Sequence, residues 1–354
     1  MKYPLHLIIR KKLSHILNAT LALFRRQKHF QEHIDPKEIK NIIIIRPNYR
    51  IGNLIFLTPL INELEQKIPH AKIDIIVGMR LAGKILEPMP NVRSVIDIPR
   101  KLLLHPVEMF DYIKKTRKTN YDLALNISGG STSAQIVTSL VKARYKATFD
   151  AHNLWAKFTH TQVRGLKTYN HMGLEVLEFL RFFDFPLPKE APSLDIKLRE
   201  EEITQAQKDL QALRKENGIT QEQKIIAIFR NARFDKKIAN EWWGEWLTAL
   251  LQKNPNIVVV DILSPDIPEK LNDNVLAYGN KDLRILGAFF RACNLYVSAD
   301  TGPMHLAVAS GAKVLALFNK TNMEVYGALG ANNKTIDIEK LTPQQVANIT
   351  LERL

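Results

Sequence analysis

Short apolar runs alternate with segments of helical periodicity along most of this 354-residue chain. The runs are rich in isoleucine, valine and leucine, which is typical of strands that are buried on both faces. They lie at residues 42–45, 73–77, 95–98 and 123–127, and then at 225–229, 257–262, 295–297 and 314–318. Because helical segments separate the runs, the pattern predicts parallel sheets with helices on both faces, which is an α/β fold.

A proline-rich stretch at residues 185–192 separates the two sets of runs and predicts a linker. A chain of this length also suits two α/β domains better than one. We therefore predict five regions, which are an N-terminal extension at 1–40, a first domain at 41–185, a linker with a helix at 186–222, a second domain at 223–340 and a C-terminal helix at 341–354.

A strand–turn–helix corner in the second domain is the most informative motif. An apolar run ends in Asp300-Thr301-Gly302, and Pro303 then opens an apolar helical segment. Threonine suits the capping position of a helix and proline its first turn, so the helix is predicted to begin here. Free N–H groups at such a start favour a phosphate, Gly302 would let it approach closely, and His305 lies in the first turn. An ordinary capped turn without a ligand is the alternative interpretation.

A second polar loop follows the first predicted strand. It contains Arg46, Asn48 and Arg50, followed by Gly52 and Asn53 and then by an apolar helical segment. The arginines suit anionic groups, and Gly52 allows a tight turn beside a ligand. The simpler interpretation is that Asn53 only caps the helix, a role that asparagine fills as well as aspartate.

These two loops resemble motifs of the glycosyltransferase family 9 enzymes, the lipopolysaccharide heptosyltransferases. Residues 300–305 resemble the family's D-[ST]-G-x-x-H signature, and residues 42–59 resemble its opening strand and R-x-x-x-x-G-D loop. The resemblance covers about residues 40–345. It implies the GT-B architecture, in which two Rossmann-like parallel-sheet domains face a central cleft. It also implies inverting, metal-independent transfer of a heptose or similar sugar from a nucleotide-diphosphate donor, ADP-heptose, to a lipopolysaccharide core or lipid A–Kdo acceptor.

The resemblance assigns residues to the sugar donor. Thr301 and the backbone at Gly302 are expected to hold the phosphates, Asp300 the sugar hydroxyls, and His305 the phosphate or sugar. Lys236 best matches the family's lysine, which neutralises the diphosphate as charge moves onto it. The other donor candidates lie in the same turn or in nearby loops, and they are Pro303, Met304, Lys237, Arg230 and Asp266. A solvated basic loop is the alternative for the two lysines.

Asn53 departs from the family pattern, in which an aspartate follows the glycine as the proposed general base. A neutral amide is not basic near neutral pH and cannot accept the proton of an acceptor hydroxyl. Three explanations are open. Asn53 orients the acceptor while another carboxylate or a group on the acceptor takes the proton, or the reaction needs little base assistance, or the protein binds a glycolipid without catalysis. The resemblance assigns Arg46, Asn48, Arg50 and Gly52 to the acceptor.

Other chemistries find less support in the sequence. A sugar-nucleotide epimerase on the same fold would need acid/base carboxylates that the sequence does not identify. The chain has no P-loop, no G-x-G-x-x-G and no paired cysteines, so we expect no metal site and no cofactor. Its single cysteine, Cys293, cannot form an internal disulfide, which favours a reducing compartment.

The basic N-terminal extension bears on the partners of the chain. Of the formal net charge of +14, residues 1–40 carry nine Lys or Arg against three Asp or Glu, and their apolar residues recur at helical spacing. A basic amphipathic helix can lie on an anionic membrane surface or pack against the first domain, and both interpretations are open. No nucleic-acid module accompanies the charge, so we expect no nucleic-acid partner. The implied location is cytoplasmic, peripheral on the inner face of a bacterial inner membrane, with residues 1–30 as the attachment.

Overall fold

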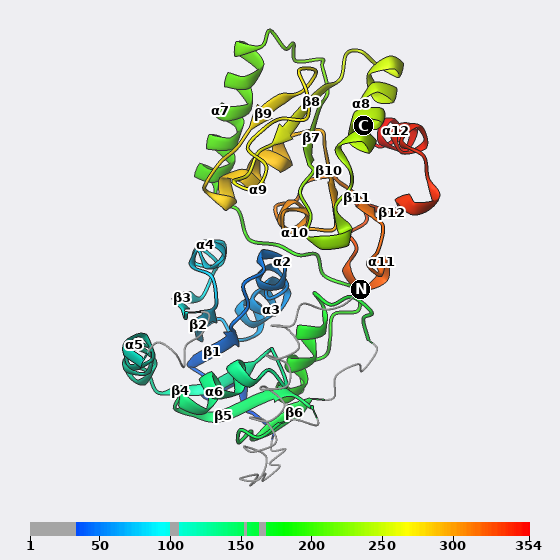
Figure 1. Ribbon diagram of the computed structural model, residues 1–354. Helices are drawn as coiled ribbons and strands as arrows, with labels where there is room; N and C mark the ends of the chain where they lie inside the picture. The colour runs from blue at the N-terminus through cyan, green and yellow to red at the C-terminus, as the bar shows by residue number, and fades with distance from the viewer. Residues whose placement is uncertain (1–32, 100–105, 152–153, 163–167) are drawn as a thin grey trace. The chain divides into compact units, whose positions relative to one another are not determined.

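The computed structural model describes residues 33–99, 106–151, 154–162 and 168–354 (Figure 1). The predicted basic helix near the N-terminus lies outside these residues. The chain divides into two compact units, of which the second comprises Arg50–Pro59, Asn170–Leu174 and Glu190–Leu354. Two segments that we predicted in the first domain, Arg50–Pro59 and Asn170–Leu174, therefore pack within the second unit.

The first unit contains a six-stranded parallel sheet in the order β3-β2-β1-β4-β5-β6. Its strands are β1 (Asn41–Arg46), β2 (Lys72–Val77), β3 (Val92–Asp97), β4 (Tyr121–Asn126), β5 (Ala143–Phe149) and β6 (His160–Gln162). The isoleucines at 42–45 of β1 are all fully buried, because the strand is central and both its faces are covered. The direction of the strand order changes between β1 and β4.

Helices of the first unit cover this sheet. They are α3 (Thr58–Lys67), which begins in the second unit, α4 (Arg80–Gly83), α5 (Pro106–Arg117) and α6 (Thr132–Leu140), with 3-10 helices η1 (Pro36–Glu38) and η3 (Glu175–Phe183). Tyr112 of α5 and Val137 of α6 pack in one core cluster with Ile43, Ile45 and Ala124 of the sheet. The single helix predicted at 54–67 is in fact two, because the chain breaks before Pro59 at the start of α3.

The second unit repeats the same topology. Its parallel sheet has the order β12-β11-β10-β7-β8-β9. The strands are β7 (Ile225–Phe229), β8 (Val258–Ile262), β9 (Leu276–Tyr278), β10 (Leu295–Ala299), β11 (Val314–Phe318) and β12 (Lys334–Asp337). Here the direction of the strand order changes between β7 and β10.

The helices of the second unit are α2 (Ile51–Ile55), α7 (Glu200–Glu216), α8 (Asn240–Lys253), α9 (Leu283–Ala292), α10 (Gly302–Ala309), α11 (Met323–Tyr326) and α12 (Pro343–Glu352), with η4 (Phe234–Lys236) and η5 (Ile338–Lys340). Trp243 and Trp246 of α8 are fully buried in the core, and the indole N–H of Trp246 donates to Thr350 Oγ1 of α12 at 3.2 Å. These tryptophans are packing residues. Among the described helices, none is both long and apolar enough to cross a membrane.

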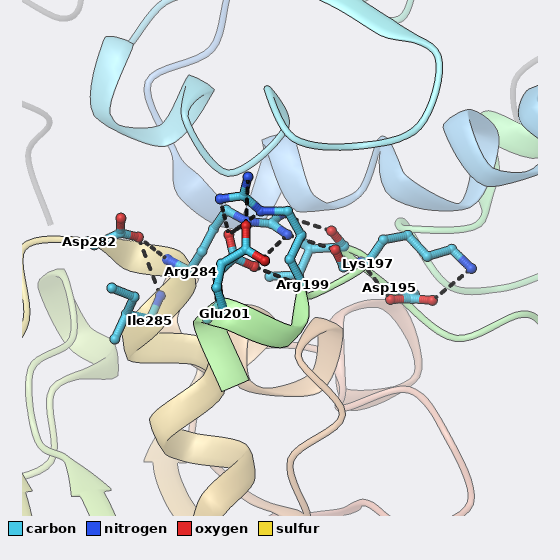
Figure 2. Close-up of polar contacts among 9 residues, drawn as sticks. Asp195, Lys197, Arg199, Glu201, Asp282, Arg284 and Ile285 are labelled. Carbon is cyan, nitrogen blue, oxygen red and sulfur yellow. Dashed lines mark hydrogen bonds and ion pairs between the residues drawn. The ribbon is translucent and has the colours of Figure 1, made fainter. Parts of the chain in front are cut away.

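A buried ionic network fixes the linker to the second unit (Figure 2). Arg284 of α9 donates from Nε and Nη2 to the two carboxylate oxygens of Glu202 of α7, at 2.7 and 2.9 Å. It also donates to the carbonyl oxygens of Ile196 and Lys197 at 2.9 and 2.7 Å. Burial acts to raise the pKa of Glu202, but the bonds from Arg284 and Arg199 outweigh it and lower that pKa, so the pair stays ionised. The network thus holds the end of the linker on α7 and α9.

Candidate functional site

The loops that leave β7 and β10 meet through an ion pair. Lys236, at the end of η4 after β7, pairs through Nζ with Oδ2 of Asp300, which directly follows β10. The side chain of Lys236 is 33% exposed and that of Asp300 is 9% exposed. In parallel α/β sheets, ligands bind beyond the carboxyl ends of the strands where the strand order changes direction. The ion pair lies at that position in the second unit.

Helix α10 begins beside this ion pair, as the sequence predicted. Thr301 is its N-cap, and Thr301 Oγ1 accepts a hydrogen bond from the backbone N–H of Met304 at 3.3 Å. Pro303, at the second helical position, has no N–H, so Gly302 supplies the remaining backbone donor of the first three positions. Thr301, Gly302 and Pro303 are half-buried, whereas the Met304 side chain is fully buried in the core. We therefore assign only the backbone of Met304, and not its side chain, to the donor-binding turn.

His305 lies inside the protein beneath the turn. It is 4% exposed, and its ring packs edge-on against that of Phe56 with centroids 4.6 Å apart. Its Nδ1 is buried and has no hydrogen-bond partner among the residues that the structure describes. Burial lowers the pKa of His305 to about 3, although the carboxylate of Asp300 acts to raise it. The ring is therefore neutral at physiological pH, and it is not a cation for a phosphate.

The two motifs identified in the sequence pack against each other. Helix α2, from the front loop, lies against the start of α10. A Cβ on Gly52 would lie 2.8 Å from Cδ2 of His305, and a Cβ on Gly302 would lie 3.1 Å from Cβ of Ile51. We expected both glycines to leave space for a ligand. In this structure, the absence of a side chain at each glycine instead allows α2 and α10 to pack closely against each other.

Asn53 lies at the third position of α2. Arg50 is the N-cap of that helix, so the interpretation of Asn53 as the cap is wrong. The Asn53 side chain is half-buried, and within the described part of the chain it makes no hydrogen bond. Its helix packs on the start of α10, and this contact brings Asn53 into the same unit as the donor motif.

The remaining acceptor candidates are divided between the two units. Arg46 and Asn48 belong to the first unit, where Nη1 of Arg46, the last residue of β1, donates to the carbonyl oxygen of Ile127, which follows β4, at 3.2 Å. The backbone N–H of Asn48 donates to the carbonyl oxygen of Arg46 at 2.6 Å. Arg50 is exposed, and like Gly52 it belongs to the second unit.

Arg230 has a structural role in this arrangement. It is 3% exposed, and its Nε donates to Asp261 Oδ2, its Nη1 to Asn240 Oδ1 and its Nη2 to the carbonyl oxygen of Glu269, each at 2.8 Å. All three guanidinium nitrogens therefore have protein acceptors. We assign Arg230 to holding the loop after β7, not to contact with a donor phosphate.

The structure distinguishes Lys236 from Lys237, which the sequence alone could not do. Lys237 is exposed, whereas Lys236 is directed onto Asp300. Asp266 is also exposed, in a tight turn beyond β8 that is closed by two backbone hydrogen bonds between Ser264 and Ile267. Because β8 pairs with β7, Asp266 follows the strand that neighbours the loop bearing Lys236.

The rings of His171 and Phe56, which were not among the residues predicted from the sequence, form one aromatic cluster with His305. Phe56 contacts His171 edge-on at 5.6 Å between centroids. His171 Nδ1 accepts from the N–H of Gly173 and Nε2 lies 3.0 Å from the carbonyl oxygen of Gly327, so the ring is neutral with its proton on Nε2. Burial lowers the pKa of His171, which favours the same state. The only signal in the sequence was Phe56 in the front motif.

The described residues contain no group of three or more His, Cys, Asp or Glu that could hold a metal ion. Lys236 contributes positive charge at the site.

Comparisons with known proteins agree with the resemblance seen in the sequence. The profile of glycosyltransferase family 9 (heptosyltransferase) matches residues 109–352. Lipopolysaccharide heptosyltransferase 3 of Escherichia coli K12 is 26% identical over 291 residues, covering 77% of this chain and 80% of the relative. Lipooligosaccharide heptosyltransferase 2 of Haemophilus influenzae is 23% identical over 298 residues, covering 80% of this chain and 84% of the relative.

Solved structures share the fold. A glycosyl transferase family 9 structure from Veillonella parvula matches with a TM-score of 0.75 at 17% identity, covering 91% of this chain and 98% of that chain. The E. coli heptosyltransferase WaaC with ADP matches with a TM-score of 0.70 at 19% identity, covering 89% of this chain and all of that chain. The same enzyme with ADP-2-deoxy-2-fluoro heptose gives a TM-score of 0.67 at 18% identity, again covering 89% of this chain and all of that chain. The two parallel sheets and these matches confirm the predicted GT-B fold class.

Proposed function

The chain belongs to glycosyltransferase family 9, the heptosyltransferases, and on that premise we propose that it transfers a heptose from ADP-heptose to the core of a lipopolysaccharide. The observation that carries the proposal is the packing of α2 on the start of α10, beside the Lys236–Asp300 pair. The part of the acceptor loop from Arg50 to Asn53 and the loops assigned to the donor thereby meet in one unit. The E. coli WaaC structures with ADP and with ADP-2-deoxy-2-fluoro heptose support an ADP-linked donor.

Donor binding changes the partners of Lys236 in this proposal. In the structure its ammonium is neutralised by Asp300. The donor diphosphate pairs with Lys236 and accepts hydrogen bonds from the N–H of Gly302 and the hydroxyl of Thr301. Asp300 then accepts hydrogen bonds from hydroxyls of the sugar. An ammonium beside the diphosphate stabilises the charge that develops as the leaving group departs, and this needs no metal ion.

Transfer then proceeds as one displacement with inversion. The acceptor oxygen forms a bond to the anomeric carbon while the bond from that carbon to the β-phosphate oxygen breaks, and ADP leaves with the electron pair. Asn53 accepts a hydrogen bond from the attacking hydroxyl and orients it, because its amide cannot take the proton. The proton passes to another carboxylate or to a group on the acceptor.

We also propose where the chain works. A lipopolysaccharide acceptor is held in a membrane, so the chain would act at the cytoplasmic face of the inner membrane. Residues 1–30, outside the described residues, would attach it there through their basic residues.

The test is detection by mass of heptose added to a truncated core acceptor from ADP-heptose. The native chain is expected to give the product, Thr301→Ala much less, and Asn53→Ala less than Asn53→Asp, because aspartate restores both an acceptor and a base. The alternative is a glycolipid-binding protein without catalysis. That alternative would be favoured if the native chain bound the acceptor but turned over no nucleotide-sugar, while Asn53→Asp did. The amide of Asn53 would then be the cause of the missing activity.

A further inference from the structure

Helix α5 of the first unit presents two large apolar side chains to solvent. Val107 is 71% exposed and Phe110 is 66% exposed, more than any other large hydrophobic residue that the structure describes. The opposite face of the helix is buried, with Tyr112 donating from its hydroxyl to the carbonyl oxygen of Val137 at 3.2 Å. Scattered exposed apolar residues are ordinary, but two on one helical turn form a surface that a partner would cover.

Cations extend this surface along the helix. With successive residues about 100° apart around the axis, one arc of about 100° contains five exposed side chains and no acidic one. In order around the arc they are Arg117, Phe110, Lys114, Val107 and Lys118, which directly follows the helix. The two acidic residues of the helix, Asp111 and Glu108, lie beyond one edge of the arc. The arc therefore has an apolar end at the first turn and a basic end at the last.

We propose that this arc of α5 docks on an anionic lipid surface. Phenylalanine and valine enter the boundary between headgroups and acyl chains, and the three cations contact lipid phosphates. The surface carries only positive charge, in a chain whose formal net charge is +14, which disfavours pairing with a second copy of the same face. The proposed site uses no residue of 1–32 and none of the donor loops, and it does not depend on the proposed reaction.

The chain allows a direct probe of this surface. Its single cysteine, Cys293, is buried, and burial raises the pKa of its thiol to about 12, so it reacts poorly with thiol reagents. A cysteine placed by Phe110→Cys can therefore be labelled selectively with nitrobenzoxadiazole, whose emission shifts to the blue and brightens in an apolar environment. Gln211→Cys, on the exposed face of α7 in the second unit, is the matched control.

The labelled full-length chains are mixed with vesicles of phosphatidylcholine alone and with vesicles containing phosphatidylglycerol. We expect the emission at position 110 to shift only with the anionic vesicles, and less at high salt, while position 211 stays unchanged. Replacing Lys114 and Lys118 by glutamine should weaken the partition that this signal reports by about thirtyfold, since each cation near the surface contributes about 1 kcal/mol.

Three results would overturn the proposal. One is unchanged emission at position 110 while the protein sediments with the vesicles, because attachment would then occur elsewhere, for instance through residues 1–32. The second is an equal shift on neutral vesicles, which would remove the role of the cations. The third is a shift that appears only when a protein partner is added.

Discussion

Two ion pairs of the second unit have similar chemistry and different surroundings. Arg230 and Asp261 are 3% and 1% exposed, and the arginine has acceptors for all three of its guanidinium nitrogens. Lys236 and Asp300 are 33% and 9% exposed, and no further acceptor for the Lys236 ammonium occurs in the described part of the chain. Both cations follow β7, and both were donor candidates from the sequence. A ligand that approached Lys236 would replace one partly exposed partner, whereas a ligand that approached Arg230 would have to replace three buried acceptors.

Burial also affects how much the Arg230–Asp261 pair contributes to stability. Burial raises the pKa of Asp261, although the charge of Arg230 acts to lower it, and Asp261 Oδ1 has no hydrogen-bond partner in the described structure. Removing water from two charges costs more than their attraction returns unless every polar atom is satisfied. The pair therefore specifies the shape of the loop more than it adds stability.

Arg230→Met should have the largest effect. Removing one member of a buried pair leaves an uncompensated charge, so unfolding should require about 3–5 kcal/mol less free energy, as measured by urea denaturation. Arg233→Met, an exposed position in the same loop, is the control and should change stability by less than about 0.5 kcal/mol. If Arg230→Met kept its stability and lost transfer, Arg230 would belong to the donor site after all.

Lys236→Met should have the next largest effect, on catalysis. Losing a group that stabilises transition-state charge lowers kcat by about 10²–10³. The stability should change little, because the pair is partly solvated. Lys237→Met is the matched control, since this exposed neighbour has the same chemistry without the contact to Asp300. Equal losses in the two variants would show that the loop acts only through its net charge.

The central strands and the corner at Thr301 could be predicted because their signals are local. The residues of β7 and β10 are all buried, so their sequences are apolar except for Ser298 and the hydroxyl of Tyr296, and the cap of α10 depends on adjacent residues. The edge strand β3 was predicted in part, as the run at 95–98, whereas the edge strands β6, β9 and β12 and the inner strand β5 were missed because they are short or mixed in polarity. The three residues of β9 alternate between half-buried and exposed, and β12 is Lys-Thr-Ile-Asp.

The packing of α2 could not be predicted from the sequence. A five-residue helix carries no local signal of the unit on which it packs, because that choice depends on contacts with residues such as His305, more than 200 positions away in the sequence. The structural role of Arg230 was hidden for the same reason, since Asp261 and Glu269 approach it only in the folded unit. Sequence motifs identified the loops, and the tertiary contacts distinguished which side chains remain accessible.

The pH dependence of stability tests the neutral state of His305, whose pKa is lowered chiefly by burial and further by His171 and Lys236, while the carboxylate of Asp300 acts to raise it. Below about pH 6.5 the unfolded chain binds a proton at this histidine, while the folded protein does not until about pH 3, so acid favours unfolding. Between pH 8 and pH 5 the native chain should lose about 2 kcal/mol more stability than His305→Gln.

The measurement is urea denaturation at several pH values between 5 and 8. His70→Gln, at an exposed position, should keep the pH dependence of the native chain. If His305→Gln showed the same dependence as the native chain, His305 would be protonated in the folded state and could pair with a phosphate.

Substitutions of Thr301 separate the role of this residue as a helix cap from its role as a ligand contact. Thr301→Ala removes the acceptor for the N–H of Met304, and losing an N-cap costs about 1 kcal/mol. Thr301→Ser keeps the hydroxyl and should keep both stability and transfer. Because a cap defect of this size leaves most molecules folded, any larger loss of kcat/KM in Thr301→Ala must come from the donor. If transfer fell only as far as the folded fraction does, Thr301 would be a cap alone, and Lys236 would remain as the charged contact of the diphosphate.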